Sequence, residues 1–109
     1  MHELGITRNI VAIVSEHAGD KLVKRVAIDI GKLSAIMPDS IRFCFDVCTK
    51  DTVLEQATLE INEIPGLGRC EECGAEIELK QLFGQCHCGC KRITCIAGED
   101  MKIKEMEVY

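Results

Sequence analysis

The chain has 109 residues, enough for one core of ordinary size or for a small core with a metal-stabilised module. It carries 13 Lys and Arg against 18 Asp and Glu, a net charge of -5. Non-specific binding to nucleic acid or to an anionic membrane requires positive charge, so the composition disfavours both functions. Because 47% of the residues are hydrophobic, we expect a globular fold.

Two helices are predicted in the first half of the chain. The first covers residues 4–18, and Gly19 follows where a left-handed C-cap is common. Its apolar face is expected to hold Ile6, Ile10, Ile13, Val14 and His17. The second helix begins at Pro38, which suits a first helical turn. Its apolar positions are Ile41, Cys44, Phe45 and Cys48.

Three strands are predicted outside the cysteine-rich segment. Residues 26–31 alternate as a half-buried strand does, and residues 58–64 form a second strand that ends before the glycine-rich break at 65–68. Residues 101–108 form the last strand, with a bulge or twist expected near Glu105. This strand has to pair with the earlier two. The predicted fold class is therefore α/β: two helices on one face of a three-stranded sheet, with an inserted zinc-ribbon module.

Eight cysteines in so short a chain would suggest disulfides in a secreted protein. The N-terminal Met-His-Glu-Leu does not begin a signal peptide, and no apolar run is long enough to cross a bilayer. We therefore expect a cytoplasmic protein without a membrane partner. In that compartment thiols stay reduced, and paired cysteines indicate a metal site.

The cysteine pattern between residues 70 and 90 predicts a structural zinc site. Cys70 and Cys73 form a C-x2-C pair, and after 12 residues comes Cys86-His-Cys88-Gly-Cys90. Two such turns can surround one zinc ion with four thiolates. Between them, residues 76–79 alternate like one strand of a ribbon hairpin. A redox dithiol or a disulfide is the alternative interpretation.

The fourth zinc ligand stays open at this point. Cys86 and Cys88 are the first choice for the second turn, because a glycine follows Cys88 as one follows Cys73. Cys90 is the reserve ligand, and His87 is the third choice. Of the remaining cysteines, Cys44 and Cys48 are expected in the core, and Cys95 in or near the ribbon.

His2 is a candidate metal ligand. The amine of Met1, the amide nitrogen of His2 and its imidazole can form chelate rings around one divalent ion, and nitrogen-rich sites suit nickel or copper. Glu3 can add an oxygen or a backbone donor. A histidine at a chain terminus is more often simply solvated, so this second interpretation remains.

The chain resembles the HypA/HybF family of hydrogenase nickel-incorporation proteins in four features. These are the start at Met1-His2-Glu3, the Asn-Glu-Ile-Pro run at 62–65, the C-x2-C segment and the Gly-Glu run into the last strand. The resemblance covers essentially the whole chain. It implies a nickel metallochaperone that is not an enzyme. Nickel would be transported cargo at Met1, His2 and Glu3, and zinc would be structural. Its implied ligands are Cys70, Cys73, Cys86 and Cys88.

The resemblance also implies partners. These are a nickel-handling GTPase of the hydrogenase maturation system and the large subunit of [NiFe] hydrogenase, with urease as the recipient for some related proteins. Whether the protein is a monomer or a homodimer stays open. The expected division is a nickel-binding α/β domain of residues 1–67 with 98–109, and a zinc-binding domain of residues 68–97.

Two other functions compete with this prediction. A zinc ribbon could bind protein or nucleic acid without any nickel role, but residues 68–96 carry four basic against four acidic residues and one aromatic residue. Such a segment has neither a basic footprint nor a stacking surface for nucleic acid. A thiol enzyme could use Cys70 and Cys73 as a redox pair, but the motif lacks a βαβ context.

Overall fold

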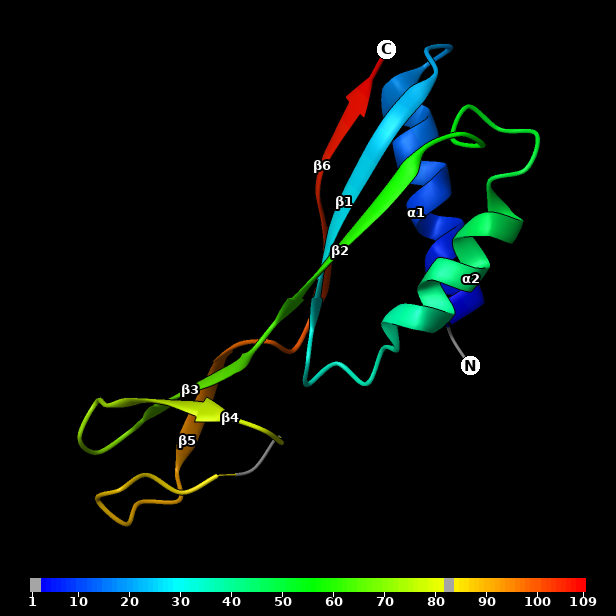
Figure 1. Ribbon diagram of the computed structural model, residues 1–109. Coiled ribbons are helices and arrows are strands. Elements are labelled where there is room, and N and C mark those ends of the chain that lie inside the picture. The colour runs from blue at the N-terminus through cyan, green and yellow to red at the C-terminus, as the bar shows by residue number, and fades with distance from the viewer. Residues whose placement is uncertain (1–2, 82–83) are drawn as a thin grey trace. The chain divides into compact units, whose positions relative to one another are not determined.

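The computed structural model of the protein describes residues 3–81 and 84–109. Its helices and strands are α1 (Glu3–Ala18), β1 (Val23–Gly31), α2 (Pro38–Cys48), β2 (Thr58–Ile64), β3 (Gly66–Cys70), β4 (Glu76–Leu79), β5 (Ile93–Ala97) and β6 (Met101–Val108). The strands form two three-stranded sheets, in the orders β2-β1-β6 and β4-β3-β5 (Figure 1).

The chain divides into two compact units. Unit 1 consists of the described residues up to Ile28, Ile36–Asn62 and Lys102–Tyr109. Unit 2 consists of Asp29–Ala35 and Glu63–Met101. The predicted assignment of nickel binding to one domain and of zinc binding to the other stays a prediction.

In unit 1, α1 and α2 pack against each other and cover the same face of the sheet β2-β1-β6 (Figure 1). The predicted fold class is confirmed: two helices lie on a three-stranded sheet, and a ribbon is inserted before the last strand. Apolar side chains that are fully buried fill the space between the helices and the sheet, among them Ile10, Val14, Val26, Ile28, Ile41 and Leu54. Neither described helix is long and apolar enough to cross a membrane.

Helix α1 ends as predicted, but its buried face differs from the prediction. Gly19 follows the helix at a φ of 65°, and its N–H donates to the Ser15 carbonyl at 3.1 Å. Ile13 is 47% exposed and His17 is exposed, so the buried face does not include these two residues of the expected apolar face. The residues that are buried are Thr7, Ile10, Val11, Val14 and Ala18. Apolar residues occupy both sides of this helix, so periodicity alone could not decide which side packs.

The sequence predicted that β1 is buried on one face only, but from Val26 to Gly31 this strand is buried on both faces. Val26–Gly31 are all buried, including Ala27 and Asp29. The reason is its central place in the sheet, where both neighbouring strands contribute side chains beside it.

Arg25 of β1 joins this central strand to both of its neighbours. Its guanidinium pairs with Glu60 of β2 at 2.8 Å and with Glu105 of β6 at 3.3 Å, and it also bonds to Glu107 of β6. The hydrogen bonds that Arg25 donates to Glu107 and Glu105 raise its pKa further above its usual value. Lys104 and Glu105 are both exposed, so the alternation along β6 changes register where a bulge or twist was expected.

The glycine-rich segment after β2 is strand β3 and not a break. Gly66 and Gly68 lie in the central strand of the ribbon sheet, where Gly66 pairs with Leu79 of β4. A Cβ on Gly66 would overlap the Leu79 carbonyl oxygen, and a Cβ on Gly68 would overlap the Ile93 side chain. Close approach of the neighbouring chain therefore requires glycine in this strand. The ribbon strand predicted at residues 76–79 is confirmed as β4.

A second glycine pair lies where Asp29–Ala35 meets the rest of unit 2. The N–H of Leu33 donates to the Gly98 carbonyl and the N–H of Gly31 to the Asp100 carbonyl, each at 2.8 Å. Gly98 has a φ of 91°, and a Cβ on Gly31 would overlap the Gly98 carbonyl oxygen. These backbone contacts explain why residues 29–35 belong to the same unit as the ribbon.

Candidate metal centre

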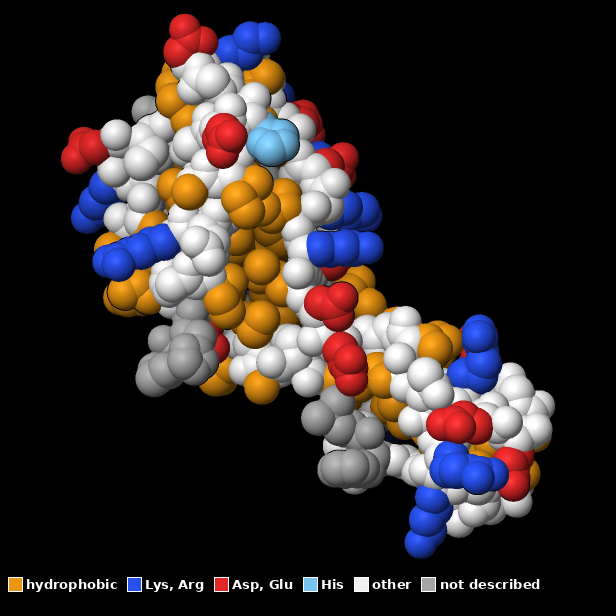
Figure 2. Space-filling model, turned by 180° about the vertical axis from the view of Figure 1, so that it is seen from behind, with side chains coloured by type: hydrophobic (Ala, Val, Ile, Leu, Met, Phe, Trp, Pro, Cys, Tyr) orange, Lys and Arg blue, Asp and Glu red, His pale blue; other side chains and the backbone are white. Residues whose placement is uncertain are grey.

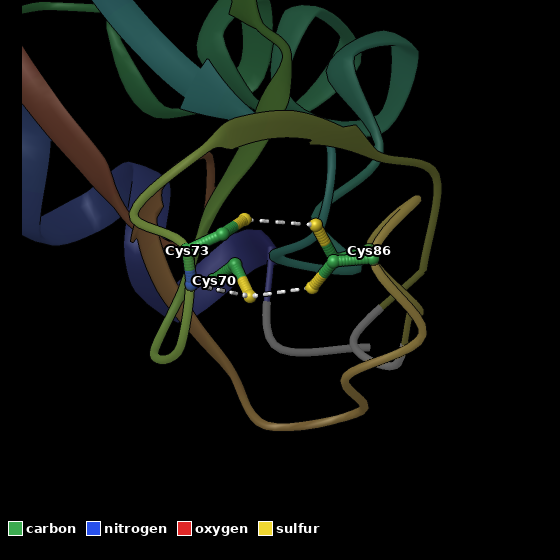
Figure 3. Close-up of side chains that lie close together, drawn as sticks. Cys70, Cys73 and Cys86 are labelled. Carbon is green, nitrogen blue, oxygen red and sulfur yellow. Dashed lines mark hydrogen bonds between the residues drawn. The ribbon is translucent and has the colours of Figure 1, made fainter.

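Two turns of unit 2 bring four cysteines together (Figure 3). Their sulfurs, on Cys70, Cys73, Cys86 and Cys88, all lie within 4.8 Å of one another. The shortest separations are 3.4 Å between Cys73 and Cys86 and 3.6 Å between Cys70 and Cys88. A tetrahedral zinc ion with Zn–S bonds of about 2.3 Å requires sulfurs about 3.8 Å apart. The cluster therefore has the donor atoms and the size of a zinc-binding group.

The first turn connects β3 to β4. The N–H of Gly74 donates to the Cys70 carbonyl at 3.0 Å, and the N–H of Cys70 donates to the Ala75 carbonyl at 2.9 Å. Gly74 has a φ of 75°, which lets the chain reverse without a Cβ clash. The N–H of Cys73 points at the Cys70 sulfur at 3.5 Å, a contact that favours a thiolate.

The second turn repeats this arrangement before β5. The N–H of Gly89 donates to the Cys86 carbonyl, and the N–H of Cys86 donates to the Cys90 carbonyl, both at 2.9 Å. Gly89 has a φ of 95°. The predicted similarity of the two Cys-Gly turns is therefore confirmed, because Gly74 after Cys73 and Gly89 after Cys88 both have a positive φ.

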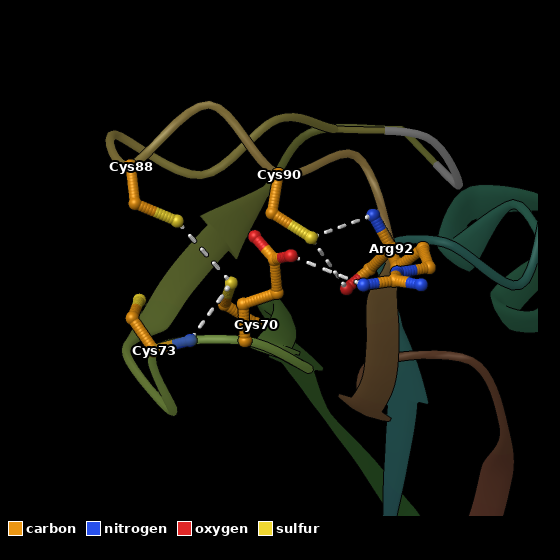
Figure 4. Close-up of polar contacts among 6 residues, drawn as sticks. Cys70, Cys73, Cys88, Cys90 and Arg92 are labelled. Carbon is orange, nitrogen blue, oxygen red and sulfur yellow. Dashed lines mark hydrogen bonds and ion pairs between the residues drawn. The ribbon is translucent and has the colours of Figure 1, made fainter.

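Cys90 and His87 lie differently from the four clustered cysteines. The Cys90 sulfur accepts a hydrogen bond from the N–H of Arg92 at 3.3 Å (Figure 4), and the Arg92 guanidinium pairs with Glu72 at 3.1 Å. His87 is exposed. Among the described residues, neither belongs to a set of potential ligands as close as the four cysteines. The geometry therefore favours Cys88 over both as the fourth ligand.

Backbone N–H groups and neighbouring sulfurs shift the pKa values of these thiols in opposite directions. The pKa of Cys70 is lowered to about 6, mainly by the backbone N–H of Cys73. For Cys88, the backbone N–H of Cys90 favours the thiolate, but the sulfurs of Cys86 and Cys70 outweigh it and raise the pKa to about 12.

Cys73 behaves like Cys88. The backbone N–H of Ala75 opposes the change, yet the sulfurs of Cys86 and Cys70 raise the pKa of Cys73 above its usual value. Like charges at these distances disfavour ionisation of the whole group. The four thiols can all be ionised together only when a cation among them compensates the charge, which a divalent metal ion does.

The predicted nickel site lies at the start of the chain. Met1 and His2 are outside the described residues. Glu3 is the first residue of α1, and two hydrogen bonds hold it: Thr7 Oγ1 donates to its carbonyl at 2.6 Å, and the N–H of Met37 donates to its carboxylate at 3.5 Å. One end of the predicted site therefore belongs to an ordered helix.

A groove of about 390 Å³ lies beside Glu3, between the first turns of α1 and α2. Its lining includes Leu4 and Phe43, which are 40% and 72% exposed. Figure 2 shows hydrophobic side chains gathered at the surface of unit 1. Sequence reasoning missed this groove, although Phe43 falls outside the apolar spacing of its helix and could have indicated an exposed aromatic residue.

Comparisons with known proteins agree over almost the whole chain. A family model described as hydrogenase/urease nickel incorporation, metallochaperone, hypA matches residues 1–108. The chain is 66% identical to the hydrogenase maturation factor HypA of Nostoc punctiforme, covering 99% of this chain and 96% of that protein. It is 43% identical to the hydrogenase maturation factor HypA of Geobacter metallireducens, covering 99% of each.

Two solution structures have the same fold. One is the Ni metallochaperone HypA from Helicobacter pylori, with 24% identity, a TM-score of 0.71 and coverage of 99% of this chain and 97% of that one. The other is a HypA protein with 23% identity, a TM-score of 0.76 and coverage of 100% and 97%. At these identities the likeness concerns the fold alone.

Proposed function

Because the chain belongs to the HypA family of hydrogenase and urease nickel-incorporation metallochaperones, we propose that it binds nickel at its N-terminus and delivers it during maturation of [NiFe] hydrogenase. The match of the family model over residues 1–108 carries this proposal, because it includes the N-terminal Met-His-Glu as well as the four-cysteine ribbon. Nickel is the cargo in this function, and zinc is structural.

The proposed nickel ligands are Met1, His2 and Glu3. An amine, amide nitrogens and an imidazole form the nitrogen-rich donor set that suits Ni²⁺. A site with so few protein ligands leaves coordination positions open, so a recipient can take over the ion. Because Glu3 begins α1, the helix anchors one end of this short segment.

The proposed zinc ligands are Cys70, Cys73, Cys86 and Cys88. Four sulfurs within 4.8 Å leave no open position for a recipient, so this ion suits a structural role and not transport. Zinc would hold the two turns together through their thiolates. The N–H groups of the turns, such as that of Cys73 on the Cys70 sulfur, stabilise these thiolates.

The charges of the ribbon support this function over a nucleic-acid module. Arg69 pairs with Glu76 and Arg92 pairs with Glu72, each at 3.1 Å. Figure 2 shows basic and acidic side chains intermixed on this part of the surface. A surface that binds nucleic acid presents clustered and unpaired basic groups instead.

The proposed partners are a nickel-handling GTPase and the large subunit of [NiFe] hydrogenase, and the proposed location is the cytoplasm. The protein acts as a carrier and not as an enzyme. The groove beside Glu3 supports a role for this end of unit 1 in partner contact, because exposed apolar side chains such as Leu4 and Phe43 are typical of interaction surfaces.

Nickel titration with metal analysis tests the proposal. His2→Ala, and a version with extra residues before Met1, should each weaken nickel binding by at least about tenfold while about one zinc ion per chain remains. His17→Ala is the matched control, because His17 is an exposed histidine of α1, with Nδ1 3.1 Å from the Ile13 carbonyl. Normal nickel affinity in His2→Ala would refute the N-terminal site.

The pH dependence of nickel binding offers a second measurement. Imidazole must lose its proton before it can bind a metal ion, so nickel affinity should fall as the pH drops through the histidine range. Unchanged affinity from neutral to mildly acidic pH would contradict the role of His2.

A further inference from the structure

Unit 2 contains a further buried cysteine, Cys90, near the four-sulfur cluster. The proposed function gives this cysteine no role. Cys90 is more than nine-tenths buried. It packs in one apolar cluster with two of the proposed ligands, Cys70 and Cys86, and Ile93 lies against this cluster. Cys90 is therefore a buried thiol that packs against residues of the proposed zinc site.

The second turn fixes where Cys90 lies. The hydrogen bond from the Cys86 N–H to the Cys90 carbonyl, at 2.9 Å, holds these two residues opposite each other across the turn. In Figure 4 the Cys88 sulfur points toward the sulfur of Cys70, and the Cys90 sulfur of the same loop lies against the backbone of Arg92. The N–H of Arg92 donates to the Cys90 sulfur at 3.3 Å.

Cys88 is the ligand that a neighbour could most readily replace. Cys73 and Cys88 are exposed, whereas Cys70 and Cys86 are buried, and of the two exposed ligands Cys88 is the one that shares a turn with Cys90. Cys88 and Cys90 belong to the same turn, and Gly89, with a φ of 95°, lies between them. Exchange of the two sulfurs therefore requires a rotation within this one turn.

We propose that Cys90 is an alternate zinc ligand that takes the place of Cys88, so that the ribbon has two interchangeable four-sulfur sets. This inference rests on the proposed zinc site. In the exchange, Cys90 gives up its thiol proton as it becomes a ligand, and Cys88 takes up a proton as it leaves. The number of bound thiolates stays four, and no electron is transferred. The ribbon can then keep its metal while the exposed Cys88 is free or chemically blocked.

Serine variants separate the two sets. Cys88→Ser and Cys90→Ser should each keep about one zinc ion per chain, and after replacement by Co²⁺ each should show the sulfur-to-cobalt charge-transfer intensity of four thiolates. The double variant should show three-thiolate intensity and bind zinc at least about tenfold more weakly than either single variant. Cys95→Ser is the matched control, since Cys95 is a half-buried ribbon cysteine whose sulfur contacts the Ala97 carbonyl.

Two results would overturn the proposal. Cys88→Ser with the same three-thiolate spectrum as the double variant would show that Cys90 does not replace it. Loss of zinc from Cys90→Ser alone, with normal binding in Cys88→Ser, would make Cys90 the fixed ligand. A wild-type protein without stoichiometric zinc would instead refute the proposed zinc site, whereas nickel titration tests the N-terminal site separately.

A measurement on the wild-type protein avoids variants that fail to fold. The zinc-loaded chain is treated briefly with N-ethylmaleimide and examined by native mass spectrometry and peptide mapping. Cys44, Cys48 and Cys95 lie outside the cluster and can take up label as well, so only labels that peptide mapping places on Cys88 or Cys90 are counted. Chains labelled at one of these two cysteines should retain zinc, and chains labelled at both should lack it. Loss of zinc from every chain labelled at Cys88 would contradict the exchange.

Discussion

The sulfur of Cys70 lies 3.6 Å from the sulfur of Cys88, a residue 18 positions later in the chain. The contact joins the turn after β3 to the turn before β5, and the pair of Cys73 and Cys86 joins the same turns at 3.4 Å. Without a cation these contacts oppose ionisation, as the raised pKa values of Cys73 and Cys88 show. With a divalent ion the same four groups become the strongest link within unit 2.

Removal of zinc should therefore unfold the ribbon before it affects the helices. Beyond its cysteines, unit 2 buries few large apolar side chains, of which Ile30 and Leu79 are the main ones. Metal binding then supplies much of its folding free energy. Hydrogen exchange after chelation should show lost protection in β3, β4 and β5 and retained protection in α1 and α2.

The variant Cys70→Ser should reproduce this effect when zinc is present, whereas Cys95→Ser should behave like the wild-type protein. Full protection of β3 in the zinc-free chain would mean that apolar packing alone holds the ribbon together.

Zinc affinity should depend steeply on pH. The raised pKa values of Cys73 and Cys88 mean that both thiols carry protons at pH 7, and both protons must leave when zinc binds. The apparent association constant should therefore rise by at least about a hundredfold per pH unit between pH 7 and 8.

Cys70 should make the pH dependence of zinc affinity steeper in acid. Its pKa of about 6 leaves it ionised at pH 7, so it contributes no proton there, but below pH 6 it is protonated and adds one more to the slope. Competition with a chelator of known proton affinity measures this dependence. A slope of less than one proton between pH 7 and 8 would contradict the charge distribution described for the cluster.

Features with a local physical cause were predicted correctly from the sequence. Helix α2 begins at Pro38 because proline suits the first helical position, and the strand at Thr58–Ile64 is where apolar alternation placed it. The four clustered cysteines were the first choice from their spacing, although Cys90 and His87 stayed open as alternatives for the fourth ligand. In each case the signal is a short local pattern of residues.

Features that depend on distant neighbours were missed. The glycines at 66 and 68 suggested a break, but their role is to admit Leu79 and Ile93 against the strand. Ile13 satisfied the helical period yet stayed exposed, because the position of the sheet decides which side of α1 is buried. The burial of Cys90 and its contact with the Arg92 amide likewise require the folded ribbon.

Arg25 should matter more for stability than a typical surface arginine. Its side chain is 20% exposed and pairs with carboxylates of both neighbouring strands, so Arg25→Met leaves Glu60, Glu105 and Glu107 without their shared cation. We expect a lower thermal midpoint, with most of the difference lost at high salt.

The matched control for Arg25 is Arg42→Met. Arg42 is 51% exposed and pairs with a single carboxylate, Asp39, three residues earlier on α2. Exposed pairs of this kind contribute little to stability, so the thermal midpoint should barely change. Equal midpoints for the two variants would show that the Arg25 network contributes no more than an ordinary surface pair.

Two glycine substitutions should have opposite effects on stability. A Cβ at Gly31 would overlap the carbonyl oxygen of Gly98, a backbone atom that cannot move without disturbing the hydrogen bonds around it, so Gly31→Ala should destabilise the fold by about 1–3 kcal/mol. Gly5 lies in the first turn of α1 with open space around it, and Gly5→Ala should stabilise the protein by about 0.5 kcal/mol. Urea unfolding of the zinc-loaded chains measures both differences, and the Gly5 variant shows that added alanine is not harmful in itself. If Gly31→Ala unfolded at the wild-type urea concentration, the backbone crossing at Gly98 could not be as tight as described.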